Sequence, residues 1–133
     1  MTQHTITLTL SPDHLTIIQA TPNPLDPVAD NDTVTWNFED ANGPVEGLRV
    51  EFQAFLPNSH RPPVVAVHPF TQFGTSSGST LGPFTVSPSA RAGIYLYAVI
   101  NSAGQVVKWQ DHLFEAGSFA AFFGGIVKPV GPP

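Results

Sequence analysis

The run of sequence from Gly93 to Val99 constrains the fold of this chain more than any other segment. Its residues, Gly-Ile-Tyr-Leu-Tyr-Ala-Val, place aromatic rings at alternate positions of an otherwise apolar stretch. Successive side chains of a strand point to opposite faces, so a strand that is apolar throughout must be covered on both faces. The stretch 88–92, Pro-Ser-Ala-Arg-Ala, indicates a loop that enters the strand through the glycine. The run therefore predicts a core strand of a β protein.

Stretches of alternating polar and apolar residues predict further strands. In 5–10 apolar side chains alternate with threonines, and 33–38 and 48–54 show the same period. Such alternation is typical of a strand with one face in a core and one in water. Trp36 lies on the apolar face of the second stretch, and we expect it to anchor the core. Less regular strands are expected at 14–19, 64–67, 81–86, 105–110 and 118–130.

Turn-forming residues separate these stretches. The chain has 14 prolines and 11 glycines, and they lie between the apolar runs rather than in one tract. The prolines within 21–27 remove backbone donors, so we expect irregular structure there. Eight or nine short strands at this spacing predict an all-β fold, specifically a two-sheet antiparallel Greek-key sandwich.

The length of 133 residues fits one domain. We place the domain at 1–128 and interpret 129–133, with the sequence Pro-Val-Gly-Pro-Pro, as a tail. Only 11% of the residues are charged, which is less than half of the globular average. Thr, Ser, Asn and Gln must therefore supply much of the polar surface.

The charge pattern argues against nucleic acid as a partner. Ten acidic and five basic residues give a net charge of −5, and the basic residues are scattered along the chain. The sequence has no run of cations that could follow a phosphate backbone. We also expect no membrane span, because the apolar stretch Phe119–Val127 is short and contains two glycines.

The chain has no cysteine, which excludes thiolate catalysis, disulfides and zinc sites with cysteine ligands. The absence of cysteine fits a reducing compartment. The first residues, Met-Thr-Gln-His-Thr-Ile-Thr-Leu, lack the basic region and apolar block of a signal peptide, which predicts a cytoplasmic location. A mature secreted form with a new initiator methionine would have the same features.

Three segments together resemble the cupredoxin-like Greek-key sandwiches. Asp32–Phe38 is similar to a turn and strand of that family, Gly93–Val99 to the strand before its copper loop, and Phe123–Val130 to its closing strand. The Gly-x-Tyr pattern at 93–95 also resembles the tyrosine corner of immunoglobulin-like domains. That second resemblance implies that the Tyr95 hydroxyl bonds back to a nearby backbone group.

The copper ligands of the cupredoxin family are missing from this chain. A blue-copper site needs two histidines and one cysteine thiolate. The resemblance places the cysteine position near Val99 and the following histidine near Ser102, and the loop after Phe38 has no histidine. It therefore implies a scaffold without copper, and we expect no cofactor.

Two groups of residues have side chains that can bind metals. Asp26, Asp30 and Asp32 lie in a loop rich in the oxygen ligands that Ca²⁺ needs. Asp and Asn also begin turns by bonding to nearby backbone groups, which is the simpler interpretation. His60 and His68 would lie about 26 Å apart on an extended segment, so we interpret them as solvated loop histidines.

One set of residues has the composition of a hydrolase site. Asp111 and Glu115 place carboxylates beside His112, and Ser76 lies in a Gly-x-Ser-x-Gly stretch. A nucleophile elbow needs a strand before the serine and a helix after it, whereas Gly82–Pro83 follows this loop and opposes a helix. Catalysis is therefore the least favoured function.

The last part of the sequence is rich in aromatic residues, which indicates either further core packing or an interaction surface. A domain of this size has too little core for all ten Phe, two Trp and two Tyr residues, and exposed aromatic rings mark binding surfaces. The candidate interaction residues are Trp109, Phe114, Phe119, Phe122 and Phe123. The leading hypothesis is a non-catalytic module that binds a partner protein or forms a homo-oligomer.

The main alternative is a sandwich that binds a sugar or another small ligand. In that case Trp36 or Trp109 would stack on the ligand, and Asn and Asp side chains from loops would supply the polar contacts. The two hypotheses differ in whether a tryptophan ring is open to solvent.

Overall fold

The computed structural model describes residues 2–22, 25–57, 64–65, 67–74, 77–109 and 124–129 of the chain. In chain order the strands are β1 (Gln3–Leu10), β2 (Thr16–Thr21), β3 (Thr33–Asp40), β4 (Gly43–Pro44), β5 (Arg49–Pro57), β6 (Val64–Val65), β7 (Thr80–Thr85), β8 (Gly93–Ile100), β9 (Lys108–Trp109) and β10 (Gly124–Lys128). These described segments contain strands, turns and bends but no helix, which confirms the all-β prediction.

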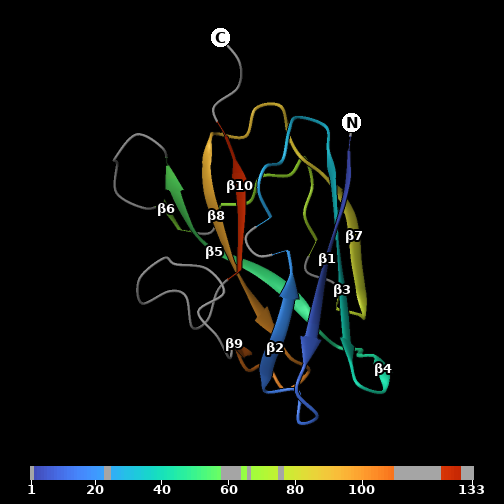
Figure 1. Cartoon of the computed structure of the whole chain (residues 1–133). Helices are drawn as coiled ribbons and strands as arrows, with labels where there is room; N and C mark the ends of the chain where they lie inside the picture. Colours follow the sequence, from blue (N-terminus) through green and yellow to red (C-terminus); the bar gives the residue numbers. More distant parts are fainter. Residues whose placement is uncertain are drawn as a thin grey trace.

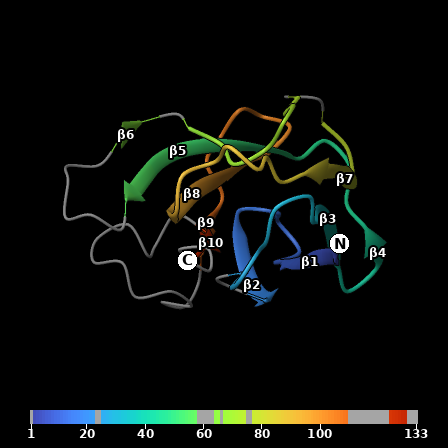
Figure 2. The ribbon, with the colours of Figure 1, turned by 90° about the horizontal axis from the view of Figure 1, so that it is seen from above.

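The strands form two sheets (Figure 1). The first sheet has the order β4-β3-β1-β2-β9, with β7 also paired to β3, and the second has the order β10-β8-β5-β6. Seen from above, β5 and β8 lie on one side of the molecule and β1, β2 and β3 on the other (Figure 2).

The first sheet is mixed, whereas the sequence predicted antiparallel pairing throughout. β1 pairs antiparallel with β2 but parallel with β3, in a register that sets Ile6 beside Trp36 and Leu8 beside Phe38. β2 in turn pairs parallel with β9. The second sheet is antiparallel, as predicted.

The parallel pairing of β1 and β3 follows from the path of the chain between β2 and β3. After β2 the chain leaves the first sheet, and Leu25–Val28 runs beside β10. The Leu25 N–H donates to the Gly125 carbonyl at 2.9 Å and the Val28 N–H to the Val127 carbonyl at 3.0 Å. The chain then returns to the first sheet as β3. A hairpin joins only antiparallel strands, but a crossing of this kind allows the next strand to run parallel.

The stretch after β8 also crosses between the sheets. The predicted hairpin return is present only at its start, where the Val107 N–H donates to the Val99 carbonyl at 2.8 Å. The chain then joins β2 of the first sheet as β9. Val107 and Trp109 both lie on the buried face, as predicted, with exposed fractions of 0% and 1%.

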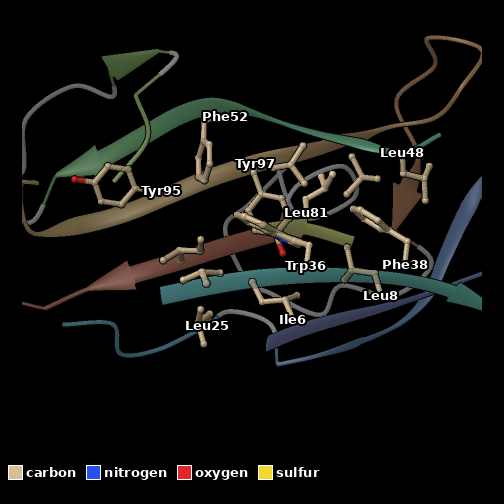
Figure 3. Packing of buried hydrophobic residues seen from close by; sticks show 14 of the residues in the cluster. Ile6, Leu8, Leu25, Trp36, Phe38, Leu48, Phe52, Leu81, Tyr95 and Tyr97 are labelled. Atoms are coloured by element: carbon tan, nitrogen blue, oxygen red, sulfur yellow. The ribbon is translucent and has the colours of Figure 1, made fainter. Parts of the chain in front are cut away.

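The core takes its aromatic side chains from both sheets. Trp36 is fully buried, as predicted, and its ring packs edge-on against Phe52 of β5 and Tyr97 of β8, at centroid distances of 6.3 and 5.4 Å (Figure 3). β8 is buried at every position except Ile94, so the prediction of a strand covered on both faces is confirmed.

Candidate functional sites

Two hollows of about 280 Å³ each lie at opposite ends of β8. The first, the acidic hollow, is lined by Asp13, His14, Leu15, Val45, Glu46, Leu48, Asn101, Ser102, Ala103 and Gln105. The second, the Arg91 hollow, is lined by Val67, His68, Phe70, Ser87, Ser89, Ala90, Arg91 and Tyr95. In Figure 1 the turns around the acidic hollow are at the lower end of the molecule, and the loop before β8 is at the upper end. Counting the described lining residues, the acidic hollow has two carboxylates and no Lys or Arg, whereas the Arg91 hollow has one guanidinium and no carboxylate.

In the acidic hollow, Asp13 is held by the turn between β1 and β2. The Ser11 hydroxyl donates to Asp13 Oδ1 at 2.5 Å, and the Leu15 N–H donates to the same oxygen at 3.1 Å. These hydrogen bonds, the one from Ser11 first, hold the pKa of Asp13 below its ordinary value. The carboxylate therefore closes its own turn, which is the ordinary role of Asp at such a position.

The next residue, His14, ties this turn to the end of β3. His14 has a φ of 59°, in the left-handed region, and its Nε2 atom lies 2.8 Å from Asp40 Oδ2. The hydrogen bond from His14, followed by one from the Asn42 N–H, lowers the pKa of Asp40. A histidine oriented by a carboxylate is one part of a general-base arrangement. The pair links the turn after β1 to the last residue of β3.

Asn101 forms the wall of the acidic hollow nearest to β8. It is 6% exposed, and its Oδ1 accepts hydrogen bonds from the Ala103 and Gln105 N–H groups, both at 3.0 Å. The Asn101 N–H also donates to the Gln105 carbonyl at 2.9 Å. The side chain therefore builds the turn after β8, and its oxygen already has two donors.

In the Arg91 hollow, the wall is formed by His68. Its Nδ1 accepts a hydrogen bond from the Phe70 N–H at 3.1 Å, and its ring stacks on Phe70 with an interplanar angle of 20°. Burial lowers the pKa of His68, so the ring is neutral near pH 7. Because Nδ1 is the acceptor, the single ring proton lies on Nε2, which is a hydrogen-bond donor. His68 was predicted to be a solvated loop residue, but it is only partly exposed and packs against aromatic rings.

The floor of the Arg91 hollow is the loop between β7 and β8, which two side chains hold in place. Lys128 Nζ donates to the Ser87 carbonyl at 3.1 Å and to the Ala90 carbonyl at 2.7 Å. The Tyr95 hydroxyl donates to the Arg91 carbonyl at 2.6 Å. This last bond is the one expected of Tyr95 from the Gly-x-Tyr pattern. Burial, the main cause, raises the pKa of Tyr95 to about 12, so the hydroxyl remains a donor at all ordinary pH values.

Arg91 itself is exposed and lies over an aromatic ring. Its guanidinium carbon is 5.4 Å from the centre of the Phe55 ring, which in turn is 4.4 Å from the ring of Tyr95. Arg49 and Lys128 have carboxylate partners, Glu51 and Asp30, but Arg91 has no ion pair with any described residue. Within the described segments its guanidinium is therefore oriented by stacking on Phe55 and is not paired with an acid.

The three aspartates considered for Ca²⁺ have separate surroundings. Asp32 is buried, and its carboxylate accepts hydrogen bonds from the Thr2 N–H at 2.8 Å, the Ala29 N–H at 2.9 Å and His4 Nε2 at 2.8 Å. Asp30 pairs with Lys128, and Asp26 is exposed. Within the described ranges, no group of three or more His, Asp or Glu side chains could hold a metal ion.

Both tryptophans are core residues. Trp36 is 0% exposed and Trp109 is 1% exposed, so neither ring offers a face to a sugar or to a partner. The other candidate interaction residues, Phe114, Phe119, Phe122 and Phe123, lie outside the described residues. So do the candidate hydrolase residues Ser76, Asp111, His112 and Glu115.

Comparisons with protein-family models, with curated proteins and with solved structures found no match to this chain. Among the segments that the structure describes, no helix is long and apolar enough to pass through a membrane. The properties of the site must therefore be inferred from the residues of this chain alone.

Sequence reasoning did not find the Arg91 hollow. Its residues come from two segments, 67–70 and 87–95, which are joined by the pairing of Phe70 with Val86. The available signal was the single arginine in an otherwise uncharged loop directly before Gly93. Nothing in the sequence indicates that His68 lies beside that loop.

Proposed function

We propose that this chain is a non-catalytic β-sandwich module with Greek-key connections, and that it forms a homodimer through the surface around β9. The contact of Trp36 with Phe52 and Tyr97 across the two sheets supports the sandwich. The order β10-β8-β5-β6, in which β8 lies between β5 and β10 and pairs with neither β7 nor β9, supports the Greek-key connections.

The observation that carries the dimer is an apolar edge patch of Leu15, Ile18 and Val106. Their exposed fractions are 48%, 41% and 48%, and they are the exposed large apolar residues of the described segments. All three lie within two residues of the pairing of Thr16 with Lys108 and of Ile17 with Trp109. Apolar residues gathered at one place on a surface with few charges are typical of an association site.

The charges beside the patch favour a second copy of this chain as the partner. A two-fold interface places the same surface on both sides, so the surface must be complementary to itself. Two charged residues lie next to Leu15. Asp13 is two residues before it in the chain, and the backbone N–H of Lys108 donates to the Leu15 carbonyl. Both side chains are exposed. In a two-fold arrangement the anion of one copy can face the cation of the other.

The opposite edge of the first sheet is less suited to association. β7 carries Pro83, which has no N–H to donate to an added strand. The end of β7 is also covered, because the Thr71 N–H donates to the Thr85 carbonyl at 2.9 Å and the Ser87 N–H to the Pro69 carbonyl at 2.8 Å. The surface around β9 is therefore preferred. The aromatic candidates Phe114, Phe119, Phe122 and Phe123 follow β9 in the chain and enter this proposal from the sequence alone.

The test is the solution mass, measured by light scattering behind a sizing column over a concentration series. We expect the wild type to be a dimer and Ile18→Lys to weaken it by at least about tenfold, because burial of an isoleucine contributes about 1.5–3 kcal/mol. The matched control is Gln3→Lys, which adds the same charge at an exposed position at the other end of β1. A wild type that stays monomeric at about 0.2 mM, or a dimer that Ile18→Lys and Val106→Lys leave intact, would overturn the proposal.

A further inference from the structure

We propose that the Arg91 hollow is a binding site for a small organic acid, with the carboxylate on Arg91 and His68 and the apolar part of the ligand against Val67, Phe70 and Tyr95. This site is separate from the edge patch, which lies near the other end of β8. The two proposals can therefore fail independently.

The charge of the hollow favours an anion. Among the described residues that line it, Arg91 alone has a full charge, and none of the described carboxylates pairs with it. A guanidinium presents parallel N–H groups that match the two oxygens of a carboxylate. A phosphate, with a charge of about −1.5 to −2 at pH 7, would need a second cation, and Lys128 is already bound to Asp30 and to two carbonyls.

His68 supplies a second donor, and its orientation is fixed. Its Nδ1 is occupied by the Phe70 N–H, so the proton lies on Nε2. Nε2 has no hydrogen-bond partner among the described residues. A carboxylate oxygen in the hollow would supply the missing acceptor. Protonation is not needed for this, since neutral imidazole donates from Nε2.

The hydroxyl groups of Ser87 and Ser89 can supply one more hydrogen-bond donor to the hollow. Ser87 Oγ and Ser89 Oγ lie 2.9 Å apart, and the Ser89 N–H donates to Ser87 Oγ at 3.2 Å. Only one proton is needed for the bond between the two hydroxyls. The other hydroxyl proton can be donated to a ligand that enters the hollow.

The size and the apolar lining select a small ligand with an apolar part. A hollow of about 280 Å³ is several times the volume of a water molecule, about 30 Å³, and is at the lower limit of ligand pockets. Phe70 is 4% exposed and Tyr95 is 1% exposed, so each ring reaches the hollow with only a small part of its surface and is held in place by the core. A benzene ring with one carboxylate has the right combination of size, charge and apolar surface.

The site is also preorganised, which reduces the entropy lost on binding. Lys128 and Tyr95 hold the backbone of the loop that carries Arg91. The Arg91 guanidinium lies over the Phe55 ring. Gly93 has no side chain, and this lets the Phe55 ring pack against its backbone. A Cβ on Gly93 would lie 2.6 Å from a ring carbon of Phe55.

The test is a titration of the ¹⁵N-labelled protein with benzoate and, separately, with benzamide, followed by amide chemical shifts at constant ionic strength. We expect benzoate to bind with a Kd on the order of 1 mM and to shift amides in 67–70 and 87–91. Benzamide has the same shape without the charge and should bind at least about tenfold more weakly.

Two substitutions and one matched control separate the site from general charge effects. Arg91→Gln should weaken benzoate binding by at least about tenfold. His68→Phe keeps the stacked ring but removes the Nε2 proton, and should weaken binding by about fivefold. Arg49→Gln removes an arginine that is paired with Glu51 elsewhere and should change the Kd by less than about twofold.

Several results would overturn the proposal. They are shifts that do not saturate by about 50 mM benzoate, equal affinity for benzoate and benzamide, or an unchanged Kd in Arg91→Gln. Arg91 is exposed, so we expect its variant to fold, and an unchanged spectrum away from the hollow verifies this. If Arg91→Gln nevertheless unfolds, the comparison of benzoate with benzamide on the wild type decides the question.

Discussion

The two hollows have the same volume and opposite charge, and they differ most in how their polar groups are used. In the acidic hollow two of the polar side chains, those of Asp13 and Asn101, already have partners within their own turns. Asp13 accepts from Ser11 and Leu15, and Asn101 accepts from two backbone N–H groups. In the Arg91 hollow, the Arg91 guanidinium and His68 Nε2 have no acceptor among the described residues. Free donors, rather than the number of polar residues, distinguish a ligand site from a well-built turn.

Each end of the molecule also has a histidine–aspartate pair, and the two pairs differ in burial. His4 Nε2 lies 2.8 Å from Asp32 Oδ2, with side chains 17% and 6% exposed. His14 Nε2 lies at the same distance from Asp40 Oδ2, with side chains 39% and 13% exposed. Exposed ion pairs contribute little because water screens them, whereas the removal of one partner of a buried pair leaves unpaired groups in the interior. The His4–Asp32 pair should therefore contribute more to the free energy of unfolding than the His14–Asp40 pair.

The largest expected effect is at the start of β8, where Gly93 has a φ of 153°. In Gly93→Ala the new Cβ would lie 2.5 Å from the Leu56 carbonyl oxygen and 2.6 Å from the Phe55 ring. We expect a loss of about 4 kcal/mol in the free energy of unfolding, from overpacking and backbone strain. Urea denaturation followed by tryptophan fluorescence measures it.

The matched control for Gly93 is at the acidic end. Gly104 also has a positive φ, 79°, but a Cβ there would meet nothing within 4 Å. Gly104→Ala should therefore lower the free energy of unfolding by only about 1 kcal/mol, the ordinary cost of a left-handed alanine. Equal losses in the two variants would show that close packing at Gly93 is not what distinguishes the two ends.

The second expected effect is the loss of the buried carboxylate at Asp32. Asp32→Ala leaves the Thr2 and Ala29 N–H groups and His4 without their acceptor, so we expect a loss of about 3 kcal/mol. Asp40→Ala, at the exposed pair, should lose much less. Denaturation of both variants at pH 7 checks this order, and a larger loss in Asp40→Ala would contradict it.

The pH dependence of Asp32 follows from its surroundings. Burial acts to raise the pKa of Asp32, but hydrogen bonds from His4 and from the Ala29 and Thr2 N–H groups outweigh it, so the pKa in the folded protein lies below its ordinary value. The unfolded chain, with a pKa of about 3.9, then holds the proton more tightly. The stabilisation is fully present above that value and is lost as the pH falls through the folded-state pKa. The unfolding free energy of Asp32→Ala should therefore depend less on pH in this range than that of the wild type.

The sequence predicted the strands well because alternation acts locally. A strand with apolar residues at every second position has one buried face whatever its neighbours are, and β1 and β3 follow this pattern. β8 is apolar throughout and is buried on both faces. The hydrogen bond of the Tyr95 hydroxyl could also be predicted from local sequence, because its acceptor, the Arg91 carbonyl, is only four residues away.

The pairing of strands and the two hollows could not be predicted, because both depend on segments far apart in the chain. The proline-rich stretch after β2 gave no sign that Leu25 would pair with β10, about a hundred residues later, and this crossing makes β1 and β3 parallel. Asp32 has the composition of a turn residue, and its partners His4 and Thr2 lie about thirty residues away. His68 and Arg91 meet in one hollow for the same kind of reason.

The smallest expected effect compares two tyrosines of β8 that are equally buried. Tyr95 and Tyr97 are 1% and 0% exposed. Within the described segments the Tyr95 hydroxyl donates to a backbone carbonyl, whereas Tyr97 Oη makes no well-formed hydrogen bond and has the Trp36 side chain as a weak polar neighbour. Tyr95→Phe should lower the free energy of unfolding by about 1 kcal/mol, because it removes a bond that holds the Arg91 loop.

Tyr97→Phe should be neutral or stabilising by up to about 1 kcal/mol, since it removes a buried polar atom that makes no well-formed hydrogen bond to the described residues. The Kd for benzoate should also differ between Tyr95→Phe and Tyr97→Phe. Loosening the loop in Tyr95→Phe should weaken binding by about two- to threefold, and Tyr97→Phe should leave the Kd unchanged. If Tyr97→Phe were the more destabilising variant, its hydroxyl would have a partner in solution.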